Sequence, residues 1–265
     1  MLQSNGQKKY LKSIKLKRLF ISLVQISIVV IFIFLWEFLT RKQIINSFIY
    51  SSPSNIFSTL KTLIISNSLL PHILTTLYEV IIAFILGISL GFLIAVIFYE
   101  FDIVAKIFDP FLTVLNSMPK VALGPIIIII AGANTKSIII MALLINLIVS
   151  ITTIYNGFLN TDKIKLKMFH TFKATKLQIL FKLVIPSSFN TIISSLKLNI
   201  ALTLIGVITG EFLVSQKGIG YLIIYGTQVF NLDLVMTGIF LLLIISFILY
   251  KLVIIIEKKV IKNSH

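Results

Sequence analysis

Ionisable side chains within otherwise apolar stretches are the first candidates for chemistry in this sequence. Glu37, Lys120, Lys197 and Glu211 all fall in or beside such stretches. A charge in hydrocarbon is costly, so it usually faces a cavity, a partner or the headgroups. These residues therefore indicate either salt-bridged or snorkelling side chains or a polar path through a helical bundle. Glu37 lies at the end of its stretch, where snorkelling is the expected behaviour.

No catalytic motif accompanies these residues. The sequence lacks H-E-x-x-H, G-x-S-x-G and paired carboxylates on one helix face. It also lacks the Walker A loop, so we do not expect this chain to hydrolyse nucleotides. Cysteine is absent, and the histidines at 72, 170 and 265 are too scattered for a metal cluster. The sequence thus predicts no catalytic residue, no cofactor and no metal site.

The composition indicates an integral membrane protein. Hydrophobic residues make up 57% of the 265 residues, charged residues 12%, and the mean hydropathy is +1.04. A soluble domain is about 45–50% apolar and about 25% charged. A bilayer-crossing helix needs roughly 20 apolar residues. The sequence predicts six of them, at 19–39, 72–98, 110–131, 137–155, 187–213 and 232–256.

The segments between these spans are also informative. Residues 53–65 are weakly amphipathic and follow a Ser-Ser-Pro-Ser helix start, which predicts a helix on the membrane surface. Residues 214–231 are expected to form a loop, in which Gly218 and Gly220 permit a tight turn. The pair Gly87 and Gly91 favours close helix packing.

The distribution of basic residues predicts the orientation. With residue 1 inside, the inner segments hold 17 of the 24 Lys and Arg residues and the outer segments hold 5. The positive-inside rule then places both termini in the cytoplasm. We expect a basic cytoplasmic N-terminus (1–18), a transmembrane domain (19–257) and a cytoplasmic tail (258–265). This asymmetry accounts for most of the net charge of +15 without nucleic acid.

The inner segment 158–185 is the longest polar stretch inside the chain and is expected to form short amphipathic helices. Periodicity leaves two interpretations open. The segment could lie as a basic face on anionic headgroups, or it could dock a cytoplasmic partner through apolar side chains at helical spacing. Those side chains are Leu166, Phe169, Phe172, Leu177, Leu180 and Phe181.

Residues 171–186, TFKATKLQILFKLVIP, resemble the cytoplasmic coupling loop of binding-protein-dependent ABC importer permeases. That loop carries E-A-A, three residues, Gly, nine residues and I-x-L-P. Pro186 matches the proline, Lys173 stands at the glycine position, and Lys167, Met168 and Phe169 stand at the E-A-A positions. Residues 118–132 and 194–223 resemble signatures of the nitrate/sulfonate/taurine branch; the second includes Gly210-Glu211-Phe212 and Gly218-Ile219-Gly220.

The resemblance implies an all-α, six-helix, type I ABC importer permease of the cell membrane. It implies a homodimeric pore, a dimer of cytoplasmic ATPase subunits and an extracytoplasmic solute-binding protein. The substrate would be a sulfonate, taurine or nitrate, or a thiamine-precursor or riboflavin-like compound. It places the ATPase contact at Phe169, Phe172, Lys173, Ala174 and Pro186. An ion-coupled secondary transporter and a membrane scaffold without transport remain the alternatives.

Four residues are candidates for the translocation path: Pro119, Lys120, Lys197 and Glu211. Pro119 and Pro125 either kink a helix or free carbonyls that line the path. Lys120 either offers charge to an anionic substrate or pairs with an acidic residue. Lys197 either faces the pore or forms a structural ion pair. Glu211 lies near the outer end of its span, where it could fix the following loop.

Overall fold

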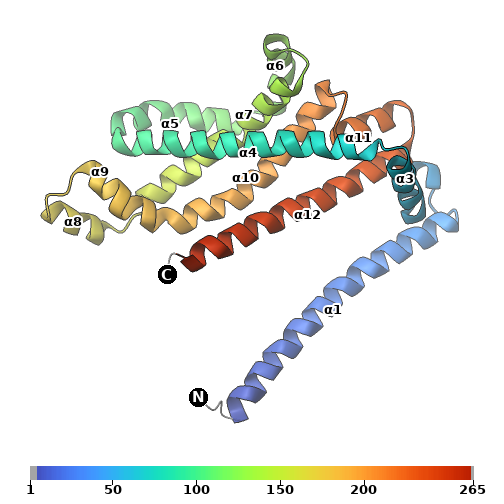
Figure 1. Ribbon diagram of the computed structural model, residues 1–265, viewed down its shortest axis with the longest axis horizontal. Coiled ribbons are helices and arrows are strands. Elements are labelled where there is room, and N and C mark those ends of the chain that lie inside the picture. The colour runs from blue at the N-terminus through green and yellow to red at the C-terminus, as the bar shows by residue number, and fades with distance from the viewer. Residues whose placement is uncertain (1–4, 264–265) are drawn as a thin grey trace.

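Long apolar helices dominate the computed structural model, which describes residues 5–263 and has no strand in that range (Figure 1). Residues 1–4 of the predicted basic N-terminus and 264–265 of the predicted tail lie outside the described residues. The long helices are α1 (Asn5–Arg41), α4 (Leu69–Glu100), α7 (Thr135–Leu159), α10 (Ile185–Val214) and α12 (Leu232–Asn263). The shorter ones are α2 (Ser47–Tyr50), α3 (Pro53–Ile65), α5 (Asp102–Ser117), η1 (Lys120–Leu123), α6 (Gly124–Ala131), α8 (Lys163–Thr171), α9 (Lys176–Ile179), η2 (Leu180–Val184) and α11 (Ile219–Gln228).

The number of candidate spans agrees with the prediction of a polytopic all-α protein. Among residues 5–263, five helices are long and apolar enough to cross a bilayer, and the bent pair of α5 with η1–α6 brings the number to six if it counts as one span. The helix predicted at 53–65 begins and ends at those residues. Ser52 caps it by accepting a hydrogen bond from the main-chain N–H of Asn55.

The third predicted span, 110–131, is broken rather than straight. α5 and the η1–α6 pair meet at an angle of 93°. The break falls at Met118 and Pro119, because a residue before proline prefers an extended conformation and Met118 adopts one. Pro125 lies in the first turn of α6, where its missing N–H has no effect on the helix. The expected kink is therefore at Pro119 and not at Pro125.

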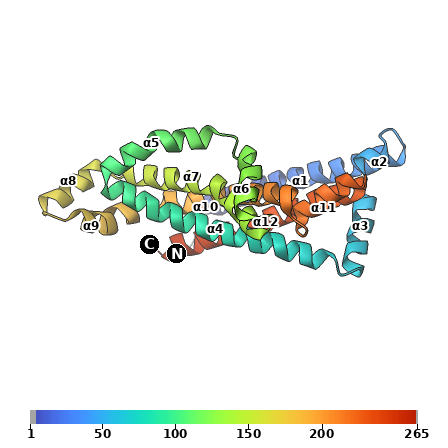
Figure 2. The same ribbon diagram turned by 90° about the horizontal axis from the view of Figure 1, so that it is seen from above.

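The centre of the fold consists of α4, α7 and α10, which cross one another closely (Figures 1 and 2). Small residues allow this approach. Gly87 of α4 lies against Asn146 of α7, and a Cβ built on Gly206 of α10 would lie 2.5 Å from the Cα of Ala142. Packing of this kind is a main source of helix association in membranes. The close approach expected at Gly87 and Gly91 is present.

The remaining helices surround this centre. α12 packs against α10, α11 and α3, and α5 lies beside α4 and α7. The segment predicted as a loop at 214–231 instead contains α11, which packs on α12. α1 touches α2 and α3 and then leaves the bundle, so its apolar side chains are exposed (Figure 1).

The bundle has two distinct ends. One carries the short helices α8 and α9, and we call it the α8–α9 end. The other carries α11 and α3, and we call it the α11 end (Figures 1 and 2). The predicted ATPase-contact residues lie at the α8–α9 end, and Glu211 lies near the α11 end.

Candidate functional site

The connection between α7 and α10 forms a compact helical projection, which we call the α8–α9 segment (163–179). Asp162 begins α8 by accepting a hydrogen bond from the N–H of Ile164, at 2.8 Å. Thr175 begins α9 in a capping box with Gln178, so that both side chains satisfy free main-chain groups. The short helices predicted for 158–185 are therefore present, each with its own start signal.

The turn between α8 and α9 explains the glycine of the family pattern. Lys173 has a φ of 54°, in the left-handed region that favours glycine. Its N–H donates to the carbonyl of His170, and the N–H of Ala174 donates to the carbonyl of Phe169, at 2.9 and 3.1 Å. These two bonds form a Schellman motif, which ends a helix with a left-handed residue. The lysine thus occupies a backbone position better suited to glycine.

The aromatic side chains of this segment divide into two groups. Phe169 and Ala174 are half-buried and pack on a cluster that includes Phe158 and Leu180. Phe172 is 75% exposed. Phe169 and Ala174 therefore hold the segment to the bundle, whereas Phe172 projects from it. The resemblance to the coupling loop implied the same role, the ATPase contact, for all three.

The exposed surface of the segment is both apolar and basic. Besides Phe172 it presents the apolar side chains of Ile164, Met168, Leu177 and the adjoining Phe181. Lysines at 163, 165, 167, 173, 176 and 182 are exposed around them. Pro186 lies in the first turn of α10 and is also exposed. This mixture suits a protein partner whose surface offers apolar pockets and acidic side chains.

The path candidates do not gather in one place. Pro119 lies at the exposed break after α5, and the Lys120 ammonium donates to the carbonyl of Asn116, at 3.1 Å. Lys197 is paired with Glu257 of α12, with 2.7 Å between Nζ and Oε2. Lys197 was expected either to face the pore or to form a structural ion pair, and its geometry matches the ion pair. For Lys120 the partner is a main-chain carbonyl rather than a carboxylate.

Glu211 fixes the turn before α11, as expected from its position near the end of α10. Its carboxylate accepts hydrogen bonds from the Thr76 hydroxyl and from the N–H of Gly220. Thr76 Oγ1 accepts in turn from the N–H of Ile219, at 2.9 Å. The N–H of Gly218 donates to His72 Nδ1, at 3.0 Å. α4 and α10 together therefore hold the start of α11.

Sequence reasoning missed Glu79, the second buried carboxyl at this end. It lies in α4, faces Glu211 and is fully buried. The available signal was simple, since Glu79 is an acidic residue inside the apolar stretch 72–98. Asn146, a polar residue inside the apolar stretch 137–155, was also missed. Its amide donates to the Ala83 carbonyl and the Thr203 hydroxyl, which links α7 to both α4 and α10.

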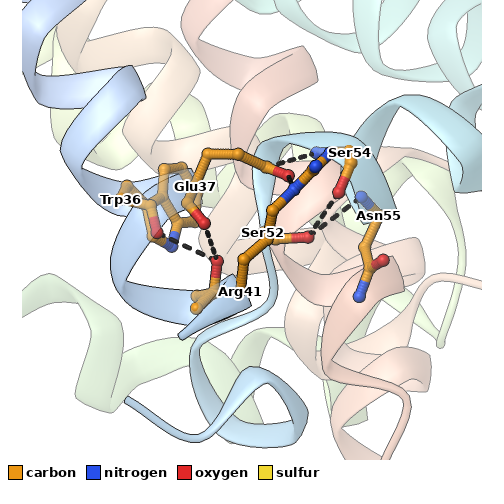
Figure 3. A network of polar contacts seen from close by, with 7 residues as sticks. Trp36, Glu37, Arg41, Ser52, Ser54 and Asn55 are labelled. Carbon is orange, nitrogen blue, oxygen red and sulfur yellow. Dashed lines mark hydrogen bonds and ion pairs between the residues drawn. The ribbon is translucent and has the colours of Figure 1, made fainter. Parts of the chain in front are cut away.

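The junction of α1 and α3 is polar (Figure 3). Glu37 pairs with Arg41, with 2.6 Å between Oε1 and Nε, and its other oxygen accepts from the N–H of Ser54. Nearby, Asp233 of α12 accepts from the Ser51 hydroxyl and the Asn55 amide. The Glu37 contacts attach α1 to the start of α3. The Asp233 contacts attach the start of α3 to α12. Glu37 therefore has a structural partner beyond the headgroups.

Comparison with known proteins identifies the class. Residues 87–262 match the model of the family described as binding-protein-dependent transport system inner membrane component. A probable ABC transporter permease protein of Haemophilus influenzae is 26% identical, covering 84% of this chain and 90% of the relative. The putative aliphatic sulfonates transport permease protein of Bacillus subtilis is 25% identical, covering 89% and 86%. The formylaminopyrimidine transport permease protein of Halalkalibacterium halodurans is 29% identical, covering 65% and 69%.

A solved structure has the same fold. The inward-facing MetNI methionine ABC transporter contains a chain that superposes with a TM-score of 0.62 at 15% identity, covering 74% of this chain and 96% of that one. At this identity the likeness concerns the fold alone. Nothing in these comparisons favours an ion-coupled secondary transporter.

Proposed function

Because the chain belongs to the family of inner membrane components of binding-protein-dependent transport systems, and is thereby an ABC importer permease, we propose that two copies form the pore. The exposed α1 supports a dimer. Its apolar side chains between Leu19 and Leu35 are exposed. A second copy and the lipid bilayer would cover them.

The α8–α9 end faces the cytoplasm in this proposal, with both chain termini on the same side. The excess of Lys and Arg in the segments at that end supports the orientation. The absence of cysteine makes it testable, because one introduced cysteine is the only thiol in the chain. In spheroplasts, Phe230→Cys at the α11 end should react with an impermeant maleimide, and Phe172→Cys should react only after lysis. The opposite pattern would reverse the orientation.

The α8–α9 segment is the proposed docking site for a separate ATPase subunit. The single observation that carries this assignment is the exposed Phe172 on a projection surrounded by lysines and anchored by Phe169 and Ala174. Closure of the two ATPase subunits around ATP would push the projections. Because η2 continues directly into α10, movement of the projection would be transmitted to the bundle centre. The chain itself contributes no reacting group to ATP hydrolysis.

The proposed substrate is a small polar solute delivered by an extracytoplasmic binding protein at the α11 end. The relatives named for aliphatic sulfonates and formylaminopyrimidine support this size and polarity. Further relatives are a taurine permease of Escherichia coli and a nitrate permease of Synechococcus elongatus. These relatives support a sulfonate such as taurine, nitrate or a thiamine precursor as the substrate, and none of them supports the riboflavin-like compound.

Transport in proteoliposomes tests this function. A tagged chain isolated from its native membrane is reconstituted with the subunits that accompany it and a purified binding protein. Uptake of taurine, an alkanesulfonate, nitrate and formylaminopyrimidine is measured with ATP at the ATPase face and with ionophores present. We expect uptake of one of them that needs ATP and survives the ionophores. Uptake that needs an ion gradient and no ATP would refute the proposal.

A further inference from the structure

Two carboxyl groups from different helices face each other inside the bundle near the α11 end. Glu79 comes from α4 and Glu211 from α10, and both side chains are fully buried. We call them the buried carboxyl pair. In the described part of the chain, neither group has a Lys or Arg within ion-pairing distance. The importer function proposed above does not involve this pair.

The two groups differ in their hydrogen bonds. Glu211 has a donor on each oxygen, since Oε1 accepts from the Thr76 hydroxyl at 2.6 Å and Oε2 accepts from the N–H of Gly220. This arrangement suits an ionised carboxylate. Glu79 is the opposite case, because both of its oxygens are buried and neither receives a hydrogen bond from the residues that the structure describes. It faces Glu211 and the Thr135 side chain at the start of α7.

An ionised Glu79 would be unfavourable in this position. It would be a buried charge without a donor, next to a second negative charge. Two ionised carboxylates also have no hydrogen between them and cannot bond to each other. One added proton removes both problems. It leaves a single negative charge on the pair and supplies the missing donor.

We propose that the buried carboxyl pair is a proton-binding site, in which a protonated Glu79 donates a hydrogen bond to an ionised Glu211. The proton then completes a chain of contacts from α4 through Glu211 to the turn before α11. That turn is fixed by Thr76, His72 and Glu211. The bound proton therefore stabilises the attachment of α11 to the bundle centre.

The other titratable groups near the pair do not compensate its charge. His72 of α4 accepts from the N–H of Gly218 through Nδ1, and its ring stacks on Tyr221 of α11. Lys217 belongs to the turn and lines a hollow of about 290 Å³ together with Thr135. Thr135 also faces Glu79, so one wall of this hollow lies next to the buried carboxyl pair.

The sign of the pH effect follows from the proton count. The attached state of α11 holds one proton on the pair, whereas a detached state exposes both carboxyls to water, where they ionise. The attached state binds more protons, so raising the pH weakens the attachment. Lowering the pH below neutrality should strengthen it until other groups titrate.

A matched pair of amide substitutions tests the site in the full-length chain in nanodiscs. Glu79→Gln keeps a donor toward Glu211, because an amide can donate where the carboxylic acid did. Glu211→Gln places an NH₂ group either against the N–H of Gly220, where donor faces donor, or against the Thr76 hydroxyl, which then loses the acceptor for its own hydrogen. Hydrogen exchange of residues 218–222 reports the attachment, and infrared spectroscopy reports the carbonyl stretch of a protonated carboxyl group.

We expect wild-type protein at neutral pH to show one protonated carboxyl band, absent from Glu79→Gln. Exchange at 218–222 should rise by about tenfold in Glu211→Gln and change little in Glu79→Gln. Relative to the intrinsic exchange rate at each pH, protection of these amides should fall in the wild type as the pH rises and stay constant in Glu79→Gln. No protonated band, or equal effects of the two substitutions, would overturn the proposal. Protection by sodium or a divalent cation without that band would show a metal-cation site instead.

These readouts do not depend on transport. If the chain shows no transport, but the protonated carboxyl band is present and the two substitutions differ in their effect on exchange, the proton site stands without the proposed function. If it imports with ATP but shows neither, only the proton site fails.

Discussion

Lys197 and Glu257 join α10 to α12 through an ion pair, with 2.7 Å between the ammonium nitrogen and Oε2. Both side chains are largely shielded, with 31% and 15% of their surfaces exposed. The pair lies toward the α8–α9 end, where α12 finishes beside α10. Its position favours a role in helix attachment over a role in binding the transported solute.

Removing the Lys197 ammonium should therefore lower the stability of the chain rather than change which solute it transports. We expect Lys197→Met to destabilise the chain by about 1 kcal/mol, because Glu257 keeps its charge without a partner. The double variant Lys197→Met/Glu257→Gln should recover most of that loss. Lys251→Met is the control, because Lys251 is exposed on α12 and has no acidic partner in the described part of the chain. Thermal unfolding in detergent measures all three. Normal stability with reduced uptake in Lys197→Met would instead place Lys197 on the path.

Replacing Lys173 by glycine should stabilise the turn after α8. A non-glycine residue in the left-handed region costs about 1 kcal/mol, and glycine removes that cost while keeping the Schellman bonds. Hydrogen exchange of residues 168–175 should slow by about fivefold in Lys173→Gly. Lys165→Gly provides the control, since the same substitution inside α8 should accelerate exchange. Faster exchange in both variants would contradict the assignment of the turn.

Truncating Phe172 should weaken docking of the ATPase without affecting the fold. We expect Phe172→Ala to reduce ATPase binding by about 2 kcal/mol, because an exposed aromatic side chain at a docking surface is a typical anchor. Phe230→Ala removes a side chain of similar exposure, 74%, at the other end of the bundle and should leave binding unchanged. Titration of the ATPase against nanodisc-embedded chain measures both. Equal binding by Phe172→Ala and wild type would remove Phe172 from the contact.

Adding a methyl group at Gly206 should separate α7 from α10. The new Cβ would lie 2.5 Å from the Cα of Ala142, and backbone atoms cannot yield as a flexible side chain can. Overpacking of this kind costs about 1–3 kcal/mol, so we expect a lower unfolding temperature for Gly206→Ala. Ala201→Leu adds more volume on an exposed part of the same helix and should have little effect. Similar unfolding temperatures for Gly206→Ala and wild type would argue against this close crossing.

Much of the architecture was predictable because apolar length is a strong signal. The spans and the helix at 53–65 follow from hydropathy and a Ser-Pro start. The loop expected at 214–231 was partly wrong, since it contains α11. α11 is short and has no distinctive pattern of its own, and it is stabilised by tertiary contacts with Thr76 and Glu211 that a linear reading does not reveal.

Individual site residues were harder to predict, because their roles depend on side-chain direction. Phe169 and Phe172 lie one helical turn apart in the sequence, yet one packs inward and the other is exposed. Lys197 lies well inside the predicted fifth span, yet its partner is sixty residues further along the chain. Glu79 was missed although its charge within an apolar stretch was visible, and its meaning became clear only beside Glu211.

Cross-linking from a single cysteine at position 172 tests the central claim most directly. The chain has no cysteine, so Phe172→Cys and Phe230→Cys each place one thiol at opposite ends of the bundle. Membranes from the native host carrying either variant are treated with a short thiol-to-amine cross-linker, and the adducts are identified by mass spectrometry. The account predicts an adduct between position 172 and a subunit with a Walker A motif, and none with that subunit from position 230. An ATPase adduct from position 230 and not from position 172 would contradict it.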